Sequence, residues 1–509
     1  MNGSKDKNKK ILLIFPPMTA KYAPNPLDIP VPHIGIAYIA SVLKSKGYNV
    51  DVIDCPAQEI DLNELYAIIN VDDYSIIGLS TYYFNSANVI RIIRKVKKES
   101  KDIFLFLGGM LPTLSAQEVI RNFRHIDCCV VGEGELTVLE LVEKVLGGEK
   151  WKHIDGIAYL NLKKEVVFTG KRKLIDDLDQ LPFPVRIKPK RELYTPILAS
   201  RGCYGNCTFC SIESYFKMCI GKKVRMRDPI KVVDEIEELQ NQGHKHIKFN
   251  DENFNVSSLK GKQWFETFYE EIKKRNINVS FIMDMRVNEV INGKEEIRKF
   301  IDIGLDFIFI GVESFVQEHL DFFQKCVSVE ENIQAMEILD ELNAHYRIGL
   351  LLFNPITKLE DIQISLQIIE KVYYLRASNM MKPISIFQPL IAVGGTDIYR
   401  YVVENGLYEN NGRGYKFQDD RVEVYYKICK KWSAIIDEIY GERFLVEGKS
   451  HKKEYYKKVY MIDLEFMKMV VDDMLKNGVR EEICYDYFIF QQQKKIEELN
   501  WNYGISKKY

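Results

Sequence analysis

The chain has 509 residues, of which 46% are hydrophobic and 28% are charged, as in globular proteins with more than one domain. Its 71 Lys and Arg residues nearly cancel its 72 Asp and Glu residues, so the overall charge favours neither a nucleic acid nor a membrane as a partner. No apolar run reaches the roughly 18–20 residues that cross a bilayer, and the stretch at residues 11–15 is too short for a signal peptide, so we expect a cytoplasmic protein.

Short apolar runs alternate with amphipathic segments in the first 150 residues. The runs, rich in Ile, Val and Leu, occupy residues 10–17, 48–56, 74–81, 102–109 and 126–135. Segments with helical spacing lie between several of them, including residues 34–47 and 88–99. Because parallel strands buried on both faces read as continuous apolar runs, this alternation predicts a doubly wound parallel α/β domain over residues 1–150.

Small and polar residues follow several of these predicted strands. They are Ser80, Thr81, Gly108, Gly109, Gly132 and Glu133. Open parallel sheets bind ligands at the carboxyl ends of their strands, where glycine lets a ligand approach the backbone. Tight turns are the alternative for any one pair, and none of the pairs forms a phosphate-binding glycine motif. Together they favour a ligand crevice without identifying the ligand.

A second series of strands and helices follows. Residues 151–192 are predicted to form a linker with a small hairpin and a Pro-rich crossing. The strands predicted after it lie at residues 194–200, 246–254, 278–286, 305–314, 346–355 and 384–395. Six strand–helix steps indicate a partial (β/α)6 TIM-like barrel over residues 193–410, whose strands carry polar residues at their carboxyl ends. Residues 411–509 lack this pattern, are dense in Tyr and Lys, and are predicted to form a helical C-terminal region.

Three cysteines lie close together in the segment ASRGCYGNCTFCSI at the end of the first predicted barrel strand. They are Cys203, Cys207 and Cys210. Three thiolates can bind zinc or an iron–sulfur cluster. A structural zinc site needs four ligands, and no second Cys or His pair with suitable spacing lies nearby. A four-iron four-sulfur (4Fe–4S) cluster on three cysteines keeps one iron free for a small molecule, so the pattern favours a cluster.

This spacing, C-x-x-x-C-x-x-C with Phe209 before the third cysteine, resembles the radical S-adenosylmethionine superfamily. The resemblance implies that S-adenosylmethionine binds the free iron of a 4Fe–4S cluster. Electron transfer from the reduced cluster would then cleave it to a 5′-deoxyadenosyl radical, which removes a hydrogen atom from the substrate. It also implies a reductant such as flavodoxin or ferredoxin as a partner.

Further residues match this family one by one. The segment KFNDENF resembles the end of the second barrel strand in the family, and there Asn250, Asp251 and Glu252 would meet the methionine part of S-adenosylmethionine. Glu252 replaces the usual Asp. Arg286 and Glu313 resemble residues that line the same site, and a salt bridge across the barrel opening is the alternative for both.

The N-terminal region resembles the cobalamin-binding domain that accompanies many of these enzymes. The resemblance rests on the segments IPVPHIGIAYIASVLKSKGYNVDVID, GLST, LGGMLPT and VVGEGE, which occur in the order that such domains show. It implies that Ser80, Thr81, Gly108, Gly109, Gly132 and Glu133 bind cobalamin. The Asp-x-His-x-x-Gly motif that ligates cobalt in cobalamin mutases is absent. His33 lacks the spacing of that motif and is expected to begin a helix.

The leading hypothesis is a cobalamin-dependent radical enzyme that methylates an unactivated carbon of a small-molecule or peptide substrate. A radical rearrangement or cyclisation without methyl transfer is the second hypothesis. A non-catalytic iron–sulfur or cobalamin-binding module is a third. A methylthiotransferase is disfavoured because the N-terminal domain lacks the cysteine triplet of those enzymes.

Overall fold

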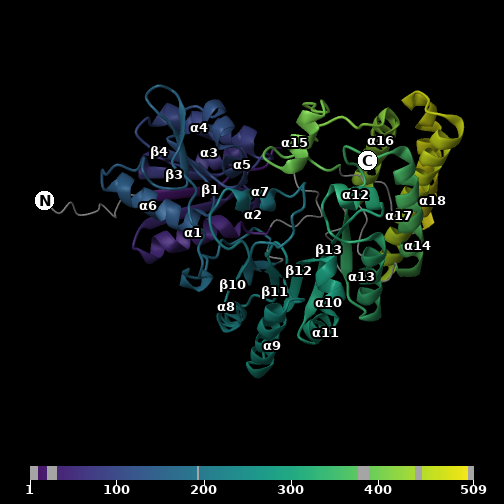
Figure 1. Cartoon of the computed structure of the whole chain (residues 1–509), viewed down its shortest axis with the longest axis horizontal. Coiled ribbons are helices and arrows are strands. Elements are labelled where there is room, and N and C mark those ends of the chain that lie inside the picture. The colour runs from purple at the N-terminus through teal and green to yellow at the C-terminus, as the bar shows by residue number, and fades with distance from the viewer. Residues whose placement is uncertain (1–9, 20–30, 192–193, 377–388, 442–449, 503–509) are drawn as a thin grey trace.

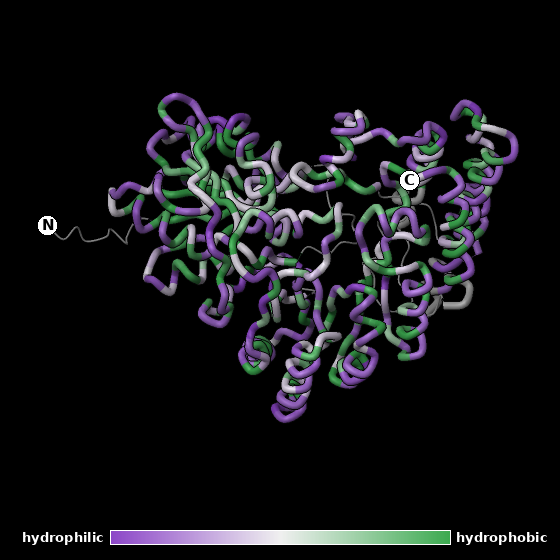
Figure 2. Tube along the Cα trace, viewed as in Figure 1, coloured by the Kyte–Doolittle hydropathy of each residue, from purple (hydrophilic) through white to green (hydrophobic). Residues whose placement is uncertain are grey.

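The computed structural model describes residues 10–19, 31–191, 194–376, 389–441 and 450–502. Two mainly parallel sheets follow one another along the chain, and long helices follow the second (Figure 1). Figure 2 shows hydrophobic residues gathered along the strands of the N-terminal sheet, whereas the surrounding helices are mixed in character. This order confirms the predicted α/β class with a helical C-terminal region.

The N-terminal sheet has seven strands in the order β2-β1-β3-β4-β5-β6-β7. Their bounds are β1 (Lys10–Phe15), β2 (Asn49–Asp54), β3 (Tyr74–Ser80), β4 (Phe104–Gly108), β5 (Cys128–Val130), β6 (Ile157–Leu160) and β7 (Val166–Phe168). The first five are parallel. The apolar runs of these strands are buried because helices pack on both faces of the sheet.

Helices cover this sheet as the doubly wound prediction requires. One face packs against α1 (Ile34–Ser45) and α6 (Gly134–Leu146). The other packs against α2 (Cys55–Gln58), α3 (Leu62–Ile68), α4 (Ser86–Glu99) and α5 (Met110–Asn122). The sequence placed the hairpin of β6 and β7 in a linker, whereas β6 pairs with β5 and extends the sheet. The physical reason is burial: Ile157 and Ala158 are both fully buried there.

The second sheet has five parallel strands in the order β14-β13-β12-β11-β8. Their bounds are β8 (Thr195–Ile197), β11 (His246–Phe249), β12 (Ser280–Arg286), β13 (Leu305–Glu313) and β14 (Tyr346–Leu350). Residues 384–388 of the sixth predicted strand lie outside the described residues. Of the remainder, Pro389 forms a parallel bridge with Phe353, and residues 390–395 form no strand. A separate antiparallel pair joins β9 (Ser200–Arg201) to β10 (Arg225–Met226).

Helices enclose the outer face of the barrel strands. They are α8 (Pro229–Asn241), α9 (Leu259–Lys274), α10 (Val287–Asn292), α11 (Lys294–Asp302), α12 (Gln317–Phe322), α13 (Val329–Glu341) and α14 (Leu359–Arg376). In contrast, α7 (Ser211–Lys217) faces the N-terminal domain, where it contacts α5. Local sequence explains where the helices begin: Asp228 accepts a hydrogen bond from the Ile230 amide, and Pro229 occupies the first turn of α8. Between strands and helices lies an aromatic core that includes Phe249, Phe281 and Phe300.

The C-terminal helices continue this core. They are α15 (Asp397–Glu404), α16 (Asp420–Gly441), α17 (Ser450–Asn477) and α18 (Asp486–Asn502). Trp432 of α16 is fully buried, stacks on Phe466 and donates to the Asp463 carboxylate at 2.9 Å. Within the described part of the chain, no helix is both long enough and apolar enough for a membrane crossing.

Asp251 connects the end of β11 to the neighbouring strand ends. Its carboxylate accepts hydrogen bonds from the Ala199 amide at 2.9 Å and from the Ser200 hydroxyl. Burial raises the pKa of Asp251 from 3.8 to about 7, although these hydrogen bonds oppose the rise.

The raised pKa of Asp251 predicts a pH dependence of stability. Between its unfolded and folded pKa values, about pH 4 to 7, the folded protein binds this proton and the unfolded chain does not. The stabilisation is therefore complete below about pH 4 and is lost as the pH rises through 7, by up to about 1.4 kcal/mol per pH unit. Asp251→Asn should flatten this part of the profile in urea unfolding at several pH values, and a variant with the wild-type slope contradicts the assignment.

Glu235 is a buried charged residue of α8. Its side chain, 1% exposed, is paired with Arg227 and with Arg186, which joins α8 to the segment before β8. Glu235→Gln removes the carboxylate that pairs most closely with the buried Arg227 and leaves it only Asp179, at 3.5 Å, which costs up to about 3–5 kcal/mol. We expect a clear fall in the urea midpoint. Glu238→Gln, an exposed position on the same helix, is the control and should unfold like the wild type.

Candidate functional site

The loop between β9 and α7 carries the three cysteines. Gly202 opens it with a φ of +92°, and a Cβ atom there would lie 2.1 Å from the Lys223 carbonyl oxygen, so only glycine fits. Cys207 is buried, and Cys203 and Cys210 are partly exposed. The Thr208 amide and hydroxyl each donate at 3.0 Å, to the carbonyls of Phe323 and Phe322, and so tie the loop to the end of α12.

The arrangement of the thiols distinguishes the two metal hypotheses. Within the described ranges, no group of three or more Cys, His, Asp or Glu side chains is placed to hold a single metal ion. A 4Fe–4S cluster bonds each cysteine to a different iron and therefore needs no such convergence. Arg286 donates to the Cys207 sulfur at 3.2 Å, which places a positive charge beside one of the three thiols. The donor set fits a cluster better than zinc.

Of the three residues that follow β11, two face a cavity and one does not. Asn250 and Glu252 line the cavity, and the Glu252 carboxylate accepts from the Gly202 amide at 2.9 Å. Asp251 points away from the cavity. Its carboxylate accepts hydrogen bonds from Ala199 and Ser200 instead. The alternation of side chains along an extended segment explains this split.

Arg286 and Glu313 lie on neighbouring strands but do not pair with each other. Glu313 has a φ of +67° and pairs with Lys325 at 2.9 Å. Arg286 donates to the Lys325 carbonyl at 2.8 Å, and its guanidinium lies 5.3 Å from the centre of the Tyr204 ring. Lys325 therefore joins the two predicted residues. Sequence reasoning missed it because it belongs to no motif.

Phe209 does not line the cavity. Its ring packs edge-on against Phe323 at 5.2 Å, on the barrel core. This contact fixes the cysteine loop to the same segment that Thr208 binds.

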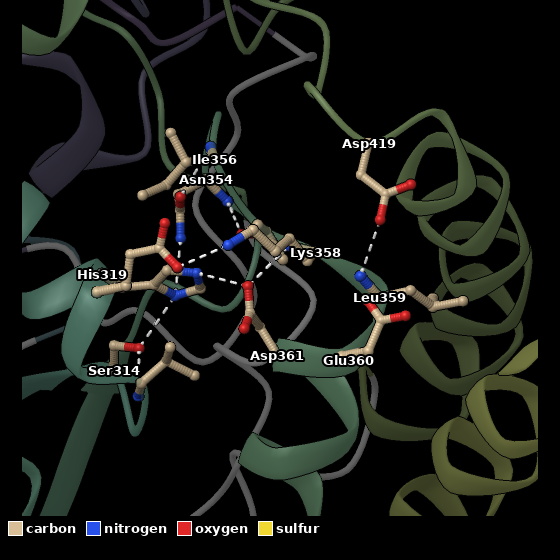
Figure 3. Close-up of polar contacts among 12 residues, drawn as sticks. Ser314, His319, Asn354, Ile356, Lys358, Leu359, Glu360, Asp361 and Asp419 are labelled. Carbon is tan, nitrogen blue, oxygen red and sulfur yellow. Dashed lines mark hydrogen bonds and ion pairs between the residues drawn. The ribbon is translucent and has the colours of Figure 1, made fainter.

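A buried polar network lies next to Glu313 in the chain (Figure 3). The Ser314 hydroxyl and the Asn354 amide nitrogen each lie 3.2 Å from His319 Nδ1, and His319 Nε2 lies 3.2 Å from the Asp361 carboxylate. Ser314 is only 4% exposed and does not line the cavity. The network therefore holds the ends of β13 and β14 against the start of α14.

A cavity of about 460 Å³ lies between the N-terminal sheet and the cysteine loop. Five of the six predicted cobalamin residues line it: Ser80, Gly108, Gly109, Gly132 and Glu133. Thr81 does not. It is fully buried, and its amide and carbonyl bond to the Gly108 carbonyl and the Leu111 amide. On the barrel side, Ile212, Tyr215 and Phe216 of α7 close the cavity.

Gly108 forms an open part of this cavity. A Cβ atom built there would meet nothing closer than the Val130 Cβ at 4.0 Å. Gly109, by contrast, has a φ of +96°, and a Cβ atom would press on the Thr81 backbone at 3.0 Å. Gly108 therefore leaves room for a ligand, whereas Gly109 makes the turn.

Charged residues join the two domains at the edge of the cavity. Glu133 pairs with Arg225 at 2.8 Å and with Arg201 at 3.2 Å, and Glu135 pairs with Arg201 at 2.6 Å. Burial alone would raise the pKa of Glu133, but the two guanidinium groups hold it below its usual value. The Glu133 carboxylate therefore forms ion pairs between the two domains. No local sequence signal predicts its partners, because Arg225 lies 92 residues away in the chain.

His33 begins α1, as the sequence predicts. Its Nδ1 accepts from the Ile36 amide at 3.3 Å. The ring also lines the cavity, where its Nε2 lies 3.1 Å from the Tyr82 hydroxyl. The predictions had not included Tyr82 as a site residue.

Two family models match the chain: the B12 binding domain over residues 27–142 and the Radical SAM superfamily over residues 197–364. A Pyrococcus horikoshii protein named "Uncharacterized methyltransferase PH0819" is 25% identical over 451 residues, which cover 86% of this chain and 93% of the relative. The anaerobic magnesium-protoporphyrin IX monomethyl ester cyclase of Rubrivivax gelatinosus is 30% identical over 63% of this chain and 59% of its own length.

A solved structure shares the whole fold. The cobalamin-dependent S-adenosylmethionine radical enzyme OxsB, with aqua-cobalamin and S-adenosylmethionine bound, superposes with a TM-score of 0.78 at 18% identity, over 98% of this chain and 82% of OxsB. The family-model matches include the cysteine loop and strands β2 to β5 of the N-terminal sheet. The chain therefore carries a Radical SAM domain and an N-terminal B12 binding domain, and it is an enzyme whose cofactors are a 4Fe–4S cluster, S-adenosylmethionine and cobalamin.

Proposed function

We propose that this enzyme methylates an unactivated carbon of a small molecule or peptide, with cobalamin as the methyl carrier and flavodoxin or ferredoxin as the reductant. The observation that carries the proposal is the shared wall of the two sites. Helix α7 begins directly after Cys210 and lines the cavity, and Arg201, two residues before Cys203, lines it as well. A methyl carrier in the cavity would lie beside the radical source.

The bound cofactors supply a carbon-centred radical and a transferable methyl group; the chain binds and orients them. We assign the cluster to Cys203, Cys207 and Cys210. Arg286 would offset the negative charge of the cluster at Cys207, and the loop contacts of Thr208 and Phe209 would keep the thiols in place.

Within the barrel, Asn250 and Glu252 are the polar residues after β11 that face the cavity, and we assign them to S-adenosylmethionine. Arg286 and Glu313 would act from the adjacent strands, each held by Lys325. Asp251 would not contact S-adenosylmethionine and would only hold the neighbouring strand ends together.

In the N-terminal domain, Ser80, Gly108 and Gly132 would contact cobalamin at the strand ends, and Gly109 and Thr81 would fix the turn beneath it. Through its ion pairs with Arg201 and Arg225, Glu133 would position β9, the strand that leads into the cysteine loop. The apolar lining, including Leu13, Val130 and Phe106, would limit the access of water to the bound cofactor.

A radical cyclisation or rearrangement is the second candidate, and the 30% identity to a cyclase favours it. S-adenosylmethionine with a deuterated methyl group separates the candidates without a known substrate. After anaerobic incubation with cobalamin and a reductant, methyl transfer predicts the label in the cobalamin recovered from the protein. Formation of 5′-deoxyadenosine with unlabelled cobalamin supports the second candidate, and no 5′-deoxyadenosine supports a non-catalytic module.

We predict that the cluster is lost in each of three variants: Cys203→Ala, Cys207→Ala and Cys210→Ala. After anaerobic reconstitution with iron and sulfide, each variant should lose most of its bound iron and all reductant-driven 5′-deoxyadenosine formation, because a cluster with two protein ligands is not retained. Cys219→Ala, also partly exposed and just beyond α7, is the matched control and should behave like the wild type. Full iron content in the three variants contradicts the cluster assignment.

We predict that Gly108→Leu weakens cobalamin binding and leaves the cluster in place. The new side chain projects into the cavity and fills part of it without a backbone clash. We expect desalted protein to retain less than about a tenth of the wild-type cobalamin while binding the same amount of iron, since lost cavity space costs several contacts. Ala87→Leu, an exposed position on α4, is the control. Equal cobalamin retention in Gly108→Leu and wild type contradicts the placement of cobalamin in this cavity.

A further inference from the structure

Four side chains on the sheet side of the cavity form a compact group at the ends of β1 and β3. Phe15, His33, Ser80 and Tyr82 all line the cavity. The His33 ring lies 4.4 Å from the Phe15 ring, and its Nε2 lies 3.1 Å from the Tyr82 hydroxyl and 3.4 Å from the Ser80 hydroxyl. Neither the family motifs nor the predicted cobalamin contacts assign a role to His33 or Tyr82.

The hydrogen-bond pattern fixes the tautomer of His33. Its Nδ1 faces the Ile36 amide, which can only donate, so Nδ1 must be the unprotonated nitrogen. A neutral imidazole then carries its hydrogen on Nε2 and donates it to the Tyr82 oxygen. Burial lowers the pKa of His33 to about 4, which keeps the ring neutral near pH 7. Nε2 is therefore a donor and offers cobalt no lone pair.

The Tyr82 hydroxyl has consequently accepted a hydrogen bond and still has its own hydrogen to donate. Within the described part of the chain, His33 is its only hydrogen-bond partner. Burial, and secondarily the charge of Glu252, raises the pKa of Tyr82 to about 12, so the phenol stays protonated near neutral pH. The hydroxyl is thus a donor without an acceptor, at the wall of the cavity.

The position of Tyr82 is set before any ligand binds. Its amide donates to the Asn85 side chain at 2.8 Å, and Asn85 in turn donates to the Ser80 carbonyl at 3.1 Å. The Tyr82 ring stacks on Phe84 with the ring centres 5.0 Å apart. A donor held from the backbone, the ring face and the hydroxyl loses little conformational entropy when it binds.

We propose that Tyr82 donates a hydrogen bond to an oxygen atom of the cobalamin in this cavity, and that His33 is the positioning residue that orients the Tyr82 hydroxyl. The inference rests on the proposed function for the presence of cobalamin. Two kinds of acceptor share this chemistry: an amide oxygen at the rim of the corrin ring, and an oxygen ligand on the cobalt. Two forms of the cofactor separate them, because hydroxocobalamin carries both kinds and methylcobalamin carries only the amide oxygens.

The test measures the dissociation constants of hydroxocobalamin and methylcobalamin with the full chain, by equilibrium dialysis and visible absorbance, in wild type and Tyr82→Phe. Loss of one hydrogen bond predicts about five-fold weaker binding, and about ten-fold or more if the acceptor is charged. Weakening of hydroxocobalamin alone assigns the contact to the cobalt ligand. Equal weakening of both forms assigns it to an amide oxygen. Tyr83→Phe is the matched control, because the Tyr83 ring packs on Phe84 and does not line the cavity.

A double-mutant cycle tests His33. Asparagine can still begin α1, so His33→Asn keeps the helix start but removes the Nε2 donor. It should weaken cobalamin binding in the wild-type background and add no further loss in Tyr82→Phe, because the two residues act through one hydroxyl. Equal losses in both backgrounds would make the effect of His33 independent of Tyr82 and would overturn its positioning role.

Two outcomes overturn the inference in different ways. If the wild type retains cobalamin and Tyr82→Phe binds both forms as tightly as the wild type and Tyr83→Phe, the inference fails and the proposed function stands. If the wild type retains neither form, both fail.

Discussion

The buried charge cluster of Glu133, Glu135, Arg201 and Arg225 is the constraint on which the relation between the two halves of the enzyme depends. All four side chains are at most 11% exposed, so each charge relies on its partners instead of water. The cluster ties the start of α6 to β9 and β10, the strand pair that enters and leaves the cysteine loop. The distance between the cofactor cavity and the cysteines is therefore set by ion pairs within the protein.

The remaining site geometry follows from this anchor. Gly202, Glu252 and Asp251 hold the strand that leads to the cysteines against β11. Lys325 and Arg286 hold the far side of the loop from the neighbouring strands. The cavity is closed by α7 because that helix begins where the loop ends, so one short segment of chain borders both the proposed radical source and the proposed methyl carrier.

Local sequence signals predicted the fold class and most of the cavity. Apolar runs give strands, helical spacing gives the covering helices, and glycines after β4 and β5 mark the place where a ligand can approach. The same signals could not separate Asp251 from its neighbours Asn250 and Glu252, because only the register of the strand decides which side chain faces the cavity. Nor could they reveal Lys325, or the partners of Glu133, since those contacts join residues far apart in the chain. The hairpin of β6 and β7 was assigned to a linker for a related reason: its partner strand is known only once the sheet is assembled.

Because the anchor uses residues from both domains, the N-terminal domain is not an interchangeable module. In a chimera whose N-terminal domain lacked carboxylates at the positions of Glu133 and Glu135, the guanidinium groups of Arg201 and Arg225 would remain buried without partners. The N-terminal sheet could still fold and still offer a cavity. However, β9, which leads into the cysteine loop, would no longer be held in position against the N-terminal domain.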